Sequence, residues 1–304
     1  MPSIDVRPFQ RRDREQLTAL VNAHVDVVLP GVAVSVNAVL SQLEREPGEY
    51  VVDPWAVERA TFVAIVRDTV VGAAHLVRYG DDARVSDSYR DTAEIRWLVF
   101  TPGEDAAADA LAARCVAAMR DWGVARMYAD GALPAPGIYG VPDVWPHVHD
   151  ALGRAGFAPG ERVEAVLLAD VADLPHAGPA PVEGMRVERA LGRHATRFSA
   201  VLDGRVVGIF EVQGDLTAGG ALSRLAGWGD VWELHVDAAM RRRGVATWLV
   251  GHGADWLRLA RVERLLDYVI VGEDDGHLAF ATALGWRELT RVRRGWSRAV
   301  SAAL

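Results

Sequence analysis

The chain has 304 residues, a formal net charge of −8 and 33 residues in its combined Lys and Arg count, every one of which is Arg. Without Lys, the sequence excludes a Walker-type phosphate loop, a protein kinase and a Schiff-base or pyridoxal enzyme, since each needs a Lys side chain. The acidic charge argues against a nucleic-acid-binding surface on the molecule as a whole, and the length predicts about two domains at roughly 150 residues each.

Cysteine content and hydropathy indicate the cellular compartment. Cys115 is the single cysteine, so no disulfide can form within the chain and a reducing compartment is expected. The residues after Met1 lack the basic start and apolar core of a signal peptide, and no apolar stretch approaches the roughly 18 residues of a membrane-spanning helix. We therefore expect a cytoplasmic protein that acts without a membrane or a nucleic acid. The sequence leaves its oligomeric state open.

The first half of the chain begins with a strand and two leading helices. A unit of further strands and helices follows them. Apolar positions at helical spacing, such as Leu17, Leu20 and Val21, predict a helix, and β-branched residues around an Asp-centred turn predict a β-hairpin. In chain order we expect a strand at 4–9, helices at 12–25 and near 36–45, a hairpin at 61–77, a strand at 94–100, a helix at 104–121, a strand near 124–129 and a short helix ending at Gly156.

A linker separates this half from a second half of similar pattern. Residues 172–184 contain three Pro and two Gly, which neither a helix nor a central strand accommodates. We therefore expect a first domain at 1–171 and a second at 185–304. Both hairpins carry Val-Val-Gly, so a duplicated β-β-β-α-β-α unit is the economical explanation, with the leading helices missing from the second copy. In the second half we expect a strand at 185–190, a hairpin at 197–212, a strand at 231–236, a helix at 244–260, a strand at 265–271 and a short helix before Gly285.

Three adjacent Arg residues stand between a buried strand and the helix expected at 244–260. A helix start offers backbone N–H groups and the positive end of the helix dipole. Gly244 and Ala246 are small enough for a ligand to approach the backbone, and Arg side chains bind phosphate through paired donors. As a merely solvated helix start, the Arg cluster would oppose the dipole by ~0.3–1 kcal/mol for each charge. We therefore favour an anion site.

The pattern Arg241-x-x-Gly244-x-Ala246, after a strand and at the start of a helix, resembles the coenzyme A pyrophosphate loop of the GNAT (Gcn5-related) N-acetyltransferases, whose signature is Gln/Arg-x-x-Gly-x-Gly/Ala. The opening Ile4-x-Val6 also looks like the first strand of a GNAT domain. Because the resemblance covers most of both halves, the whole chain resembles a tandem GNAT protein. It implies an α+β fold of two GNAT-like acyl-CoA N-acyltransferase domains, each a mixed, mostly antiparallel sheet flanked by helices.

The resemblance also implies where acetyl-CoA, the expected co-substrate, binds. Backbone groups at the end of the strand at 231–236 would pair with the pantetheine arm, amides at the helix start would hold the pyrophosphate, and a splayed gap before the next strand would admit the coenzyme. No metal is implied. The coenzyme-binding residues expected on this basis are Leu234, His235, Val236, Arg241, Arg242, Arg243, Gly244, Val245, Ala246 and Thr247.

The first half departs from this loop pattern. Glu104 and Asp105 stand where the second half has its Arg cluster, and carboxylates suit a helix start but not a pyrophosphate. We therefore predict that the first half does not bind coenzyme A in the family's manner. A Pro- and Gly-rich loop at 133–149 carries two aromatic residues and two His. It is open to two interpretations, a substrate wall or lid, or a segment that plugs an unused coenzyme slot.

Acetyl transfer to an amine by direct attack needs a base that removes the amine proton. The candidates on or beside the strand at 231–236 are Asp230, Glu233 and His235. Strand alternation places Glu233 and His235 on one face. We favour Glu233 as the base, acting directly or through a water, while a bulge would shift the alternation and keeps Asp230 open.

The acid that would protonate the departing thiolate is less well defined. The family's usual acid is a Tyr four residues before the closing Gly, and this chain has Ala281 at that position. We take Tyr268 as the substitute, while Asp274, Asp275, His277 and water remain alternatives.

With the resemblance, the sequence predicts an acetyl-CoA-dependent N-acetyltransferase with catalysis in the second domain. We expect a small molecule with a primary amine as the acceptor, because an acidic chain attracts a cation. The alternatives are a non-catalytic acyl-CoA-binding or sensor module and a transferase that uses another acyl-CoA. The missing Tyr favours the module, whereas the intact Arg loop favours retention of the coenzyme.

Overall fold

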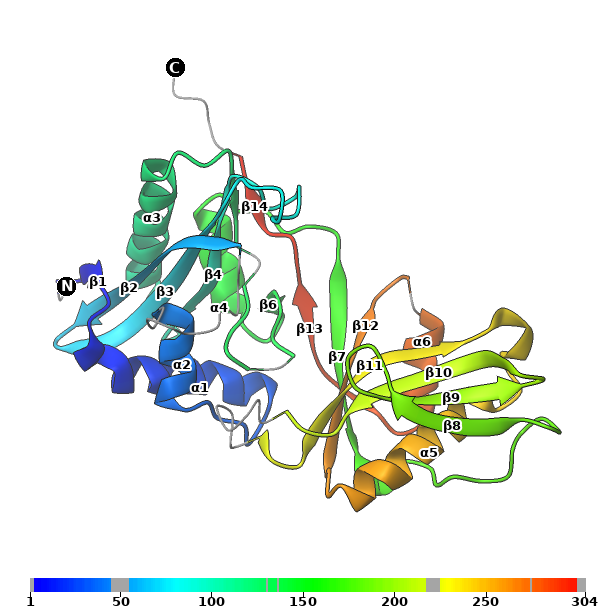
Figure 1. The fold of residues 1–304 in the computed structure, drawn as a ribbon. Coiled ribbons are helices and arrows are strands. Elements are labelled where there is room, and N and C mark those ends of the chain that lie inside the picture. Colours follow the sequence, from blue (N-terminus) through cyan, green and yellow to red (C-terminus); the bar gives the residue numbers. More distant parts are fainter. Residues whose placement is uncertain are drawn as a thin grey trace. The chain divides into compact units, whose positions relative to one another are not determined.

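The computed structural model describes residues 3–44, 55–129, 131–135, 137–216, 225–273 and 275–299. The chain folds into two compact units, residues 1–164 with 290–304, and residues 165–289 (Figure 1). Compared with the boundaries expected from the sequence, the first unit gains the C-terminal segment, and the second unit gains the stretch before the linker and the linker itself. Within the described ranges, no helix combines the length and apolar character needed to cross a membrane.

The first unit is built on a six-stranded sheet. In chain order its elements are β1 (Asp5–Pro8), α1 (Arg14–Val28), α2 (Val36–Leu43), β2 (Ala56–Val66), β3 (Thr69–Tyr79), β4 (Thr92–Phe100), α3 (Asp105–Asp121), β5 (Arg126–Tyr128), β6 (Val141–Pro142), α4 (Pro146–Arg154) and β14 (Ser297–Arg298). The strand order is β1-β2-β3-β4-β5-β14. Neighbouring strands are antiparallel except β4 and β5, which are parallel and connected through α3. Leu17, Val21 and Val25, four residues apart, bury one face of α1.

The C-terminal strand explains why the described residues 290–299 belong to the first unit. In β14, Ser297 pairs with Tyr128 of β5. Trp296, which precedes β14, is 3% exposed, and its ring lies 5.2 Å from that of His149. Backbone pairing and a buried Trp therefore hold this segment on the first sheet, although the sequence assigned it to the second domain.

The second sheet has the strand order β6-β13-β7-β12-β11-β10-β9-β8. Its elements beyond β6 are β7 (Val163–Asp170), β8 (Arg186–Leu191), β9 (Thr196–Leu202), β10 (Arg205–Gln213), β11 (Trp228–Val236), α5 (Val245–Leu259), β12 (Arg264–Ile270), α6 (Asp275–Ala283) and β13 (Arg287–Arg293). The parallel strands β11 and β12 are connected through α5. No sequence pattern predicted β7 or β13. Because β7 is buried along most of its length, it lacks the alternation that marks a half-exposed strand.

Helix α5 lies close against the second sheet. A Cβ at Gly253 would lie 2.3 Å from the ring of Phe210. Gly inside a helix costs roughly 0.5–1 kcal/mol relative to Ala, and here it permits this close contact. The linker packs on the same helix, where the indole Nε1 of Trp248 donates to the carbonyl oxygen of Gly178 at 3.0 Å. The linker is thus an ordered part of the second unit.

The second unit lacks the leading helices, as the sequence indicated. In the first unit α1 and α2 stand between β1 and β2, whereas residues 192–195 alone join β8 to β9 in the second. This difference leaves the side chains on one face of β9, β10 and β11 without a covering helix from that connection.

Candidate functional site

The strands β11 and β12 are paired over only part of their length. The pairing joins Trp228 through Asp230 to Arg264 through Leu266, although β11 continues to Val236 and β12 to Ile270. On its other edge, β11 has a bulge: Val231 pairs with Val212 and Glu233 with Glu211, which makes Trp232 an extra residue. A bulge bends its strand. The end of the pairing and the bulge together define a slot between β11 and β12 that begins at Asp230.

The bulge also decides which side chains share a face. Val231 belongs to the core beneath α5, and after the bulge Leu234 and Val236 pack against the same core. Asp230, Glu233 and His235 therefore lie on the opposite face of β11. Strand alternation alone had grouped Glu233 with His235. The structure adds Asp230 to that face.

A pocket of about 620 Å³ opens beside the slot. The end of β11, the loop to α5, the first turn of α5 and the start of α6 form it. Its described lining includes every coenzyme-binding residue expected from the sequence except Arg243. The lining residues are Leu234, His235, Val236, Met240, Arg241, Arg242, Gly244, Val245, Ala246, Thr247, Glu273, Gly276, His277 and Phe280.

The start of α5 is suited to an anion. Gly244 caps the helix with φ 83°, in the left-handed region, so no side chain caps the first turn and no acidic residue lies in it. The exposed Arg241 and Arg242 precede it, and Arg241 Nε donates to the carbonyl oxygen of Val236 at 3.1 Å. The first-turn amides and two guanidinium groups therefore surround one rim of the pocket.

Asp230 is the most perturbed carboxyl group near the slot. Its Oδ1 is buried and has no hydrogen-bond partner among the described residues. Burial raises the pKa of Asp230 to about 6, and the negative charge of Asp267 adds to the rise, while a hydrogen bond from Trp232 opposes it. A buried carboxylate with a raised pKa is a candidate for proton transfer.

The other predicted catalytic residues have different surroundings. The side chain of Glu233 is 46% exposed and lies 3.5 Å from the Nη2 atom of Arg197. His235 is also exposed, and its Nε2 lies 3.6 Å from Asp237. Tyr268 is on β12, where its backbone N–H donates to Oδ1 of Asp267 at 2.8 Å, and its hydroxyl is buried.

Asp267 and His277 form a pair that no sequence pattern predicted. Asp267 is 4% exposed on β12, and its Oδ2 lies 2.8 Å from Nε2 of His277 on α6. His277 was one of several alternatives for the acid, but Asp267 was not singled out. The available signal was a single carboxylate within the apolar run of β12, a residue type that is rarely buried without a partner.

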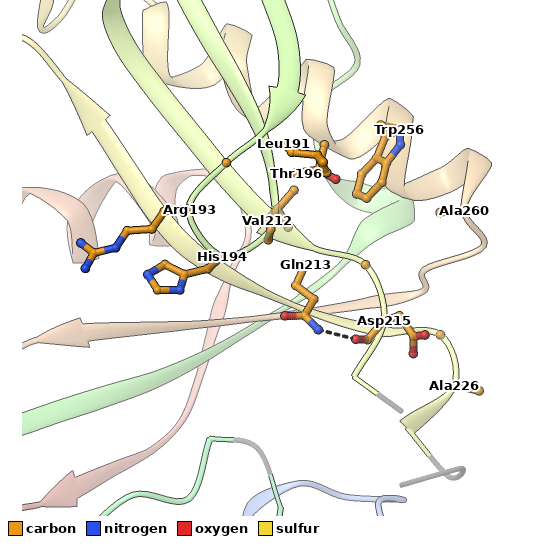
Figure 2. A pocket seen from close by; sticks show the side chains of 14 residues that line it. Leu191, Arg193, His194, Thr196, Val212, Gln213, Asp215, Ala226, Trp256 and Ala260 are labelled. Atoms are coloured by element: carbon orange, nitrogen blue, oxygen red, sulfur yellow. Dashed lines mark hydrogen bonds between the residues drawn. The ribbon is translucent and has the colours of Figure 1, made fainter. Parts of the chain in front are cut away.

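A second pocket, of about 760 Å³, lies at the end of the sheet where the turn from β8 to β9 meets the ends of β10 and α5 (Figure 2). The buried Glu211 accepts hydrogen bonds from the backbone of His194 and Ala195 at 2.6 and 2.8 Å. Burial alone would raise the pKa of Glu211, but these bonds and Arg197 hold it at about 2. The clamped turn carries His194, whose ring stacks on Trp232 with centroids 4.4 Å apart.

Residues 167–286 match the model of the acetyltransferase (GNAT) family. The second unit belongs to this family. Solved structures agree on the fold. A tandem GNAT protein from the clavulanic acid biosynthesis pathway has a TM-score of 0.64 and 16% identity, over 99% of this chain and 100% of that one. A GCN5-related N-acetyltransferase from Sphaerobacter thermophilus gives 0.59 and 14%, over 99% and 97%.

A third similar structure is larger than this chain. It is a fungal multi-domain GH3 beta-N-acetylglucosaminidase with a GCN5-related glucosamine N-acetyltransferase region, matched with a TM-score of 0.63 and 16% identity over 98% of this chain. This chain spans 38% of that protein's length. No curated protein sequence matches the chain. The family match makes the second unit an acetyltransferase-family domain, and the solved structures show that the whole chain has a tandem GNAT fold.

The first GNAT-like unit has the same slot in a filled form. Between β4 and β5 the space is about 20 Å³, lined in part by Leu133 and Ile138 of the Pro- and Gly-rich loop. The backbone just before that loop runs so close to β4 that a Cβ at Gly131 would lie 1.9 Å from the carbonyl oxygen of Arg96. For the described part of the loop, this favours the plug over the substrate wall.

Proposed function

We propose that the second unit is an N-acetyltransferase that moves the acetyl group of acetyl-CoA to the primary amine of a small molecule by direct attack, in the cytoplasm. One observation carries the proposal. The buried carboxylate of Asp230 stands where the pairing of β11 with β12 ends, beside a pocket whose rim is a cationic helix start. A base and an anion site therefore flank one slot.

The residues of the pocket suit acetyl-CoA. Its phosphates need N–H donors and positive charge, which the first turn of α5, Arg241 and Arg242 supply. Its pantetheine arm carries amides, which need hydrogen-bond partners. The backbone of β11 from Leu234 to Val236 can provide them, because it lies beyond the end of the pairing with β12. When bound there, acetyl-CoA supplies the activated acyl group.

In the proposed reaction, Asp230 removes a proton from the attacking amine. The amine nitrogen forms a bond to the thioester carbonyl carbon, the C–S bond breaks, and the electron pair leaves with sulfur. A pKa of about 6 keeps Asp230 ionised at neutral pH while leaving it more basic than an ordinary carboxylate. We assign the role to Asp230 over Glu233 because the latter is exposed and paired with Arg197.

We place the acceptor on the face of the sheet that carries Asp230. Trp232 on that side is 48% exposed and held between His194 and the Oε1 of Gln213, to which its Nε1 donates at 3.3 Å. This gives a rigid aromatic surface beside the base. The adjoining pocket of about 760 Å³ has the size of a small-molecule site, and the net charge of −8 favours a cationic amine.

A thiol-release assay with acetyl-CoA and a panel of small primary amines tests the proposal. We expect turnover with at least one amine, a loss of roughly 10²–10⁴-fold in kcat for Asp230→Asn, and a change within about twofold for the matched control Glu233→Gln, because an exposed ion pair contributes little. Unchanged kcat in Asp230→Asn would remove the base assignment.

Two other outcomes select the alternative functions. Acetyl-CoA binding without turnover of any amine would favour a binding or sensor module. Faster turnover with another acyl-CoA would identify a different donor.

A further inference from the structure

We propose that the acceptor is an amine joined to a flat aromatic ring that stacks on Trp232, and that Glu211 is the positioning residue that holds this stacking surface in place. The inference rests on the proposed function, because it names the substrate class of the acceptor site. Two observations carry it. A half-exposed indole is fixed beside the proposed base, and a buried carboxylate organises the turn that fixes the indole.

The indole of Trp232 is exposed and yet held in one orientation. The side chain belongs to the bulge of β11 and is 48% exposed. The imidazole of His194 stacks on it, with ring centroids 4.4 Å apart and planes inclined by 15°. At its edge, Nε1 donates to Oε1 of Gln213 at 3.3 Å. The imidazole covers one face of the indole, and the exposed remainder is accessible to a second ring.

Glu211 on β10 fixes the turn that carries His194. Its side chain is 1% exposed. The carboxylate accepts the backbone N–H groups of Arg193, His194 and Ala195 at 3.3, 2.6 and 2.8 Å, and Nε of Arg197 donates to it at 2.8 Å. A buried charge is costly unless it is paired and hydrogen-bonded. These bonds outweigh burial and hold the pKa of Glu211 at about 2, so the group stays ionised and keeps the turn in place.

The residue that begins this turn is matched to the carboxylate. A Cβ at Gly192 would lie 2.3 Å from Oε2 of Glu211, which is far inside van der Waals contact. Glu211 could yield to a larger residue at this position only by giving up hydrogen bonds to the turn. Gly192 and Glu211 together therefore define one conformation of the turn, and that conformation places His194 on Trp232.

The position of the indole indicates what it would bind. A hydrogen bond from Trp232 acts on Asp230, so a ring stacked on this indole would place an amine on a short linker near the proposed base. Stacked aromatic pairs gain energy beyond the area they bury, and a saturated ring lacks this gain. The adjoining pocket of about 760 Å³, which His194 and Gln213 help to line, has room for further substituents (Figure 2). The site therefore should prefer a flat ring.

The test compares acetylation of 2-phenylethylamine and 2-cyclohexylethylamine, which share a carbon skeleton and differ in the flatness of the ring. The readout is the ratio of their kcat/KM values, each corrected for the fraction of neutral amine. This ratio does not depend on how much of a variant is folded. In the wild-type chain we expect a ratio of roughly 2–10 in favour of the aromatic amine. Trp232→Leu, Glu211→Gln and Gly192→Ala should each bring the ratio close to unity.

Two control variants match these changes at positions outside the turn. Glu188→Gln on β8 removes a carboxylate that forms an exposed ion pair with Arg186. Gly178→Ala adds a Cβ that would meet no heavy atom within 4 Å. Both controls should keep the wild-type ratio.

The possible results separate the inference from the proposed function. A wild-type ratio of unity, or turnover of other amines but of neither ring amine, overturns the aromatic acceptor and leaves the transferase intact. A ratio that falls in Trp232→Leu but persists in Glu211→Gln and Gly192→Ala overturns the positioning role of Glu211. A wild-type chain that acetylates no amine of the panel instead overturns the proposed function.

Discussion

The two slots of this protein share a backbone design and differ in their side chains. In the first unit, Thr92 through Glu94 pair with β5, and Arg96 is the extra residue of a bulge in β4. In the second, Trp228 through Asp230 pair with β12, and Trp232 is the extra residue. Glu94 and Asp230 thus occupy equivalent positions, each two residues before the bulge.

What surrounds these two carboxylates differs. Glu94 is 3% exposed and accepts a hydrogen bond from the hydroxyl of Tyr79, while Arg96 Nη1 lies 3.4 Å away. Asp230 has a buried Oδ1 without a partner among the described residues. Glu94 thus has bonding partners in place, whereas burial raises the pKa of Asp230 to about 6. The residue at the bulge is therefore the main difference between the two positions. Arg96 lies beside the structural carboxylate of Glu94, and Trp232 lies near the candidate base Asp230.

The helix starts differ in the same sense. In the first unit, Asp105 opens α3 and pairs with Arg154 at 3.2 Å, and the slot of about 20 Å³ is filled. In the second, Arg241 and Arg242 precede α5 beside about 620 Å³. A cationic helix start and an open slot thus occur together in the second unit, and the described residues of the first unit show neither.

The pH profile gives the largest effect that could break this comparison. A base works only when ionised, so protonation of Asp230 should lower kcat/KM roughly tenfold for each pH unit below its pKa of about 6, in addition to the slope that ionisation of the amine itself imposes. Asp230→Asn should remove this limb, and Glu94→Gln should retain it. A wild-type profile that is flat from pH 4 to 8 contradicts the base assignment.

The next effect concerns coenzyme affinity. Arg241→Ala with Arg242→Ala should weaken acetyl-CoA binding by at least roughly 10–100-fold, because losing even one hydrogen bond to a charged group costs a net of roughly 1.5–3 kcal/mol. The paired change Glu104→Ala with Asp105→Ala at the other helix start should leave affinity unchanged. Calorimetry measures both, and unchanged affinity in the Arg variant shows that the pyrophosphate lies elsewhere.

Replacing each of the two equivalent carboxylates, Asp230 and Glu94, by its amide should change the free energy of unfolding in opposite directions. Asp230 has a folded-state pKa of about 6 against 3.8 for the unfolded chain, so its ionisation destabilises the fold as pH rises between these values. Asp230→Asn should therefore raise the unfolding free energy by up to about 3 kcal/mol at pH 7 and by nothing below pH 3. Urea unfolding at both pH values measures this gain, and a loss of stability at pH 7 would contradict it.

Glu94→Gln should instead lower the unfolding free energy by roughly 1–3 kcal/mol, because it leaves Arg96 facing a neutral amide. The same urea titration at pH 7 measures this loss. A stabilising effect of Glu94→Gln would show that the two positions are not distinguished by their partners.

Local residue patterns predicted most strands and helices of the second unit and the loop that lines its pocket. The Arg241 to Ala246 pattern depends on local residue order, so one segment was enough to predict the pocket rim that the structure assembles. The bulge at Trp232 depends on cross-strand register with β10, which strand alternation does not encode. For that reason Asp230 was left open and Glu233 was preferred.

Contacts between segments far apart in the chain could not be predicted either, because local sequence patterns do not encode them. The pairing of β14 with β5 joins segments far apart in the chain, and no motif near Trp296 signals it. The partnership of Asp267 with His277 likewise requires knowing that α6 packs on β12. The loop at 133–149 was open to two interpretations because its composition fits both, and the small space that Leu133 and Ile138 help to line favours the plug.

The most direct measurement of the central claim is the stoichiometry of acetyl-CoA binding to the full chain by titration calorimetry. We predict one site per chain, weakened by the Arg241 and Arg242 changes and unaffected by those at Glu104 and Asp105. Two sites per chain, or a single site that persists in the Arg variant at wild-type affinity, would contradict an account in which the second unit alone keeps the coenzyme slot.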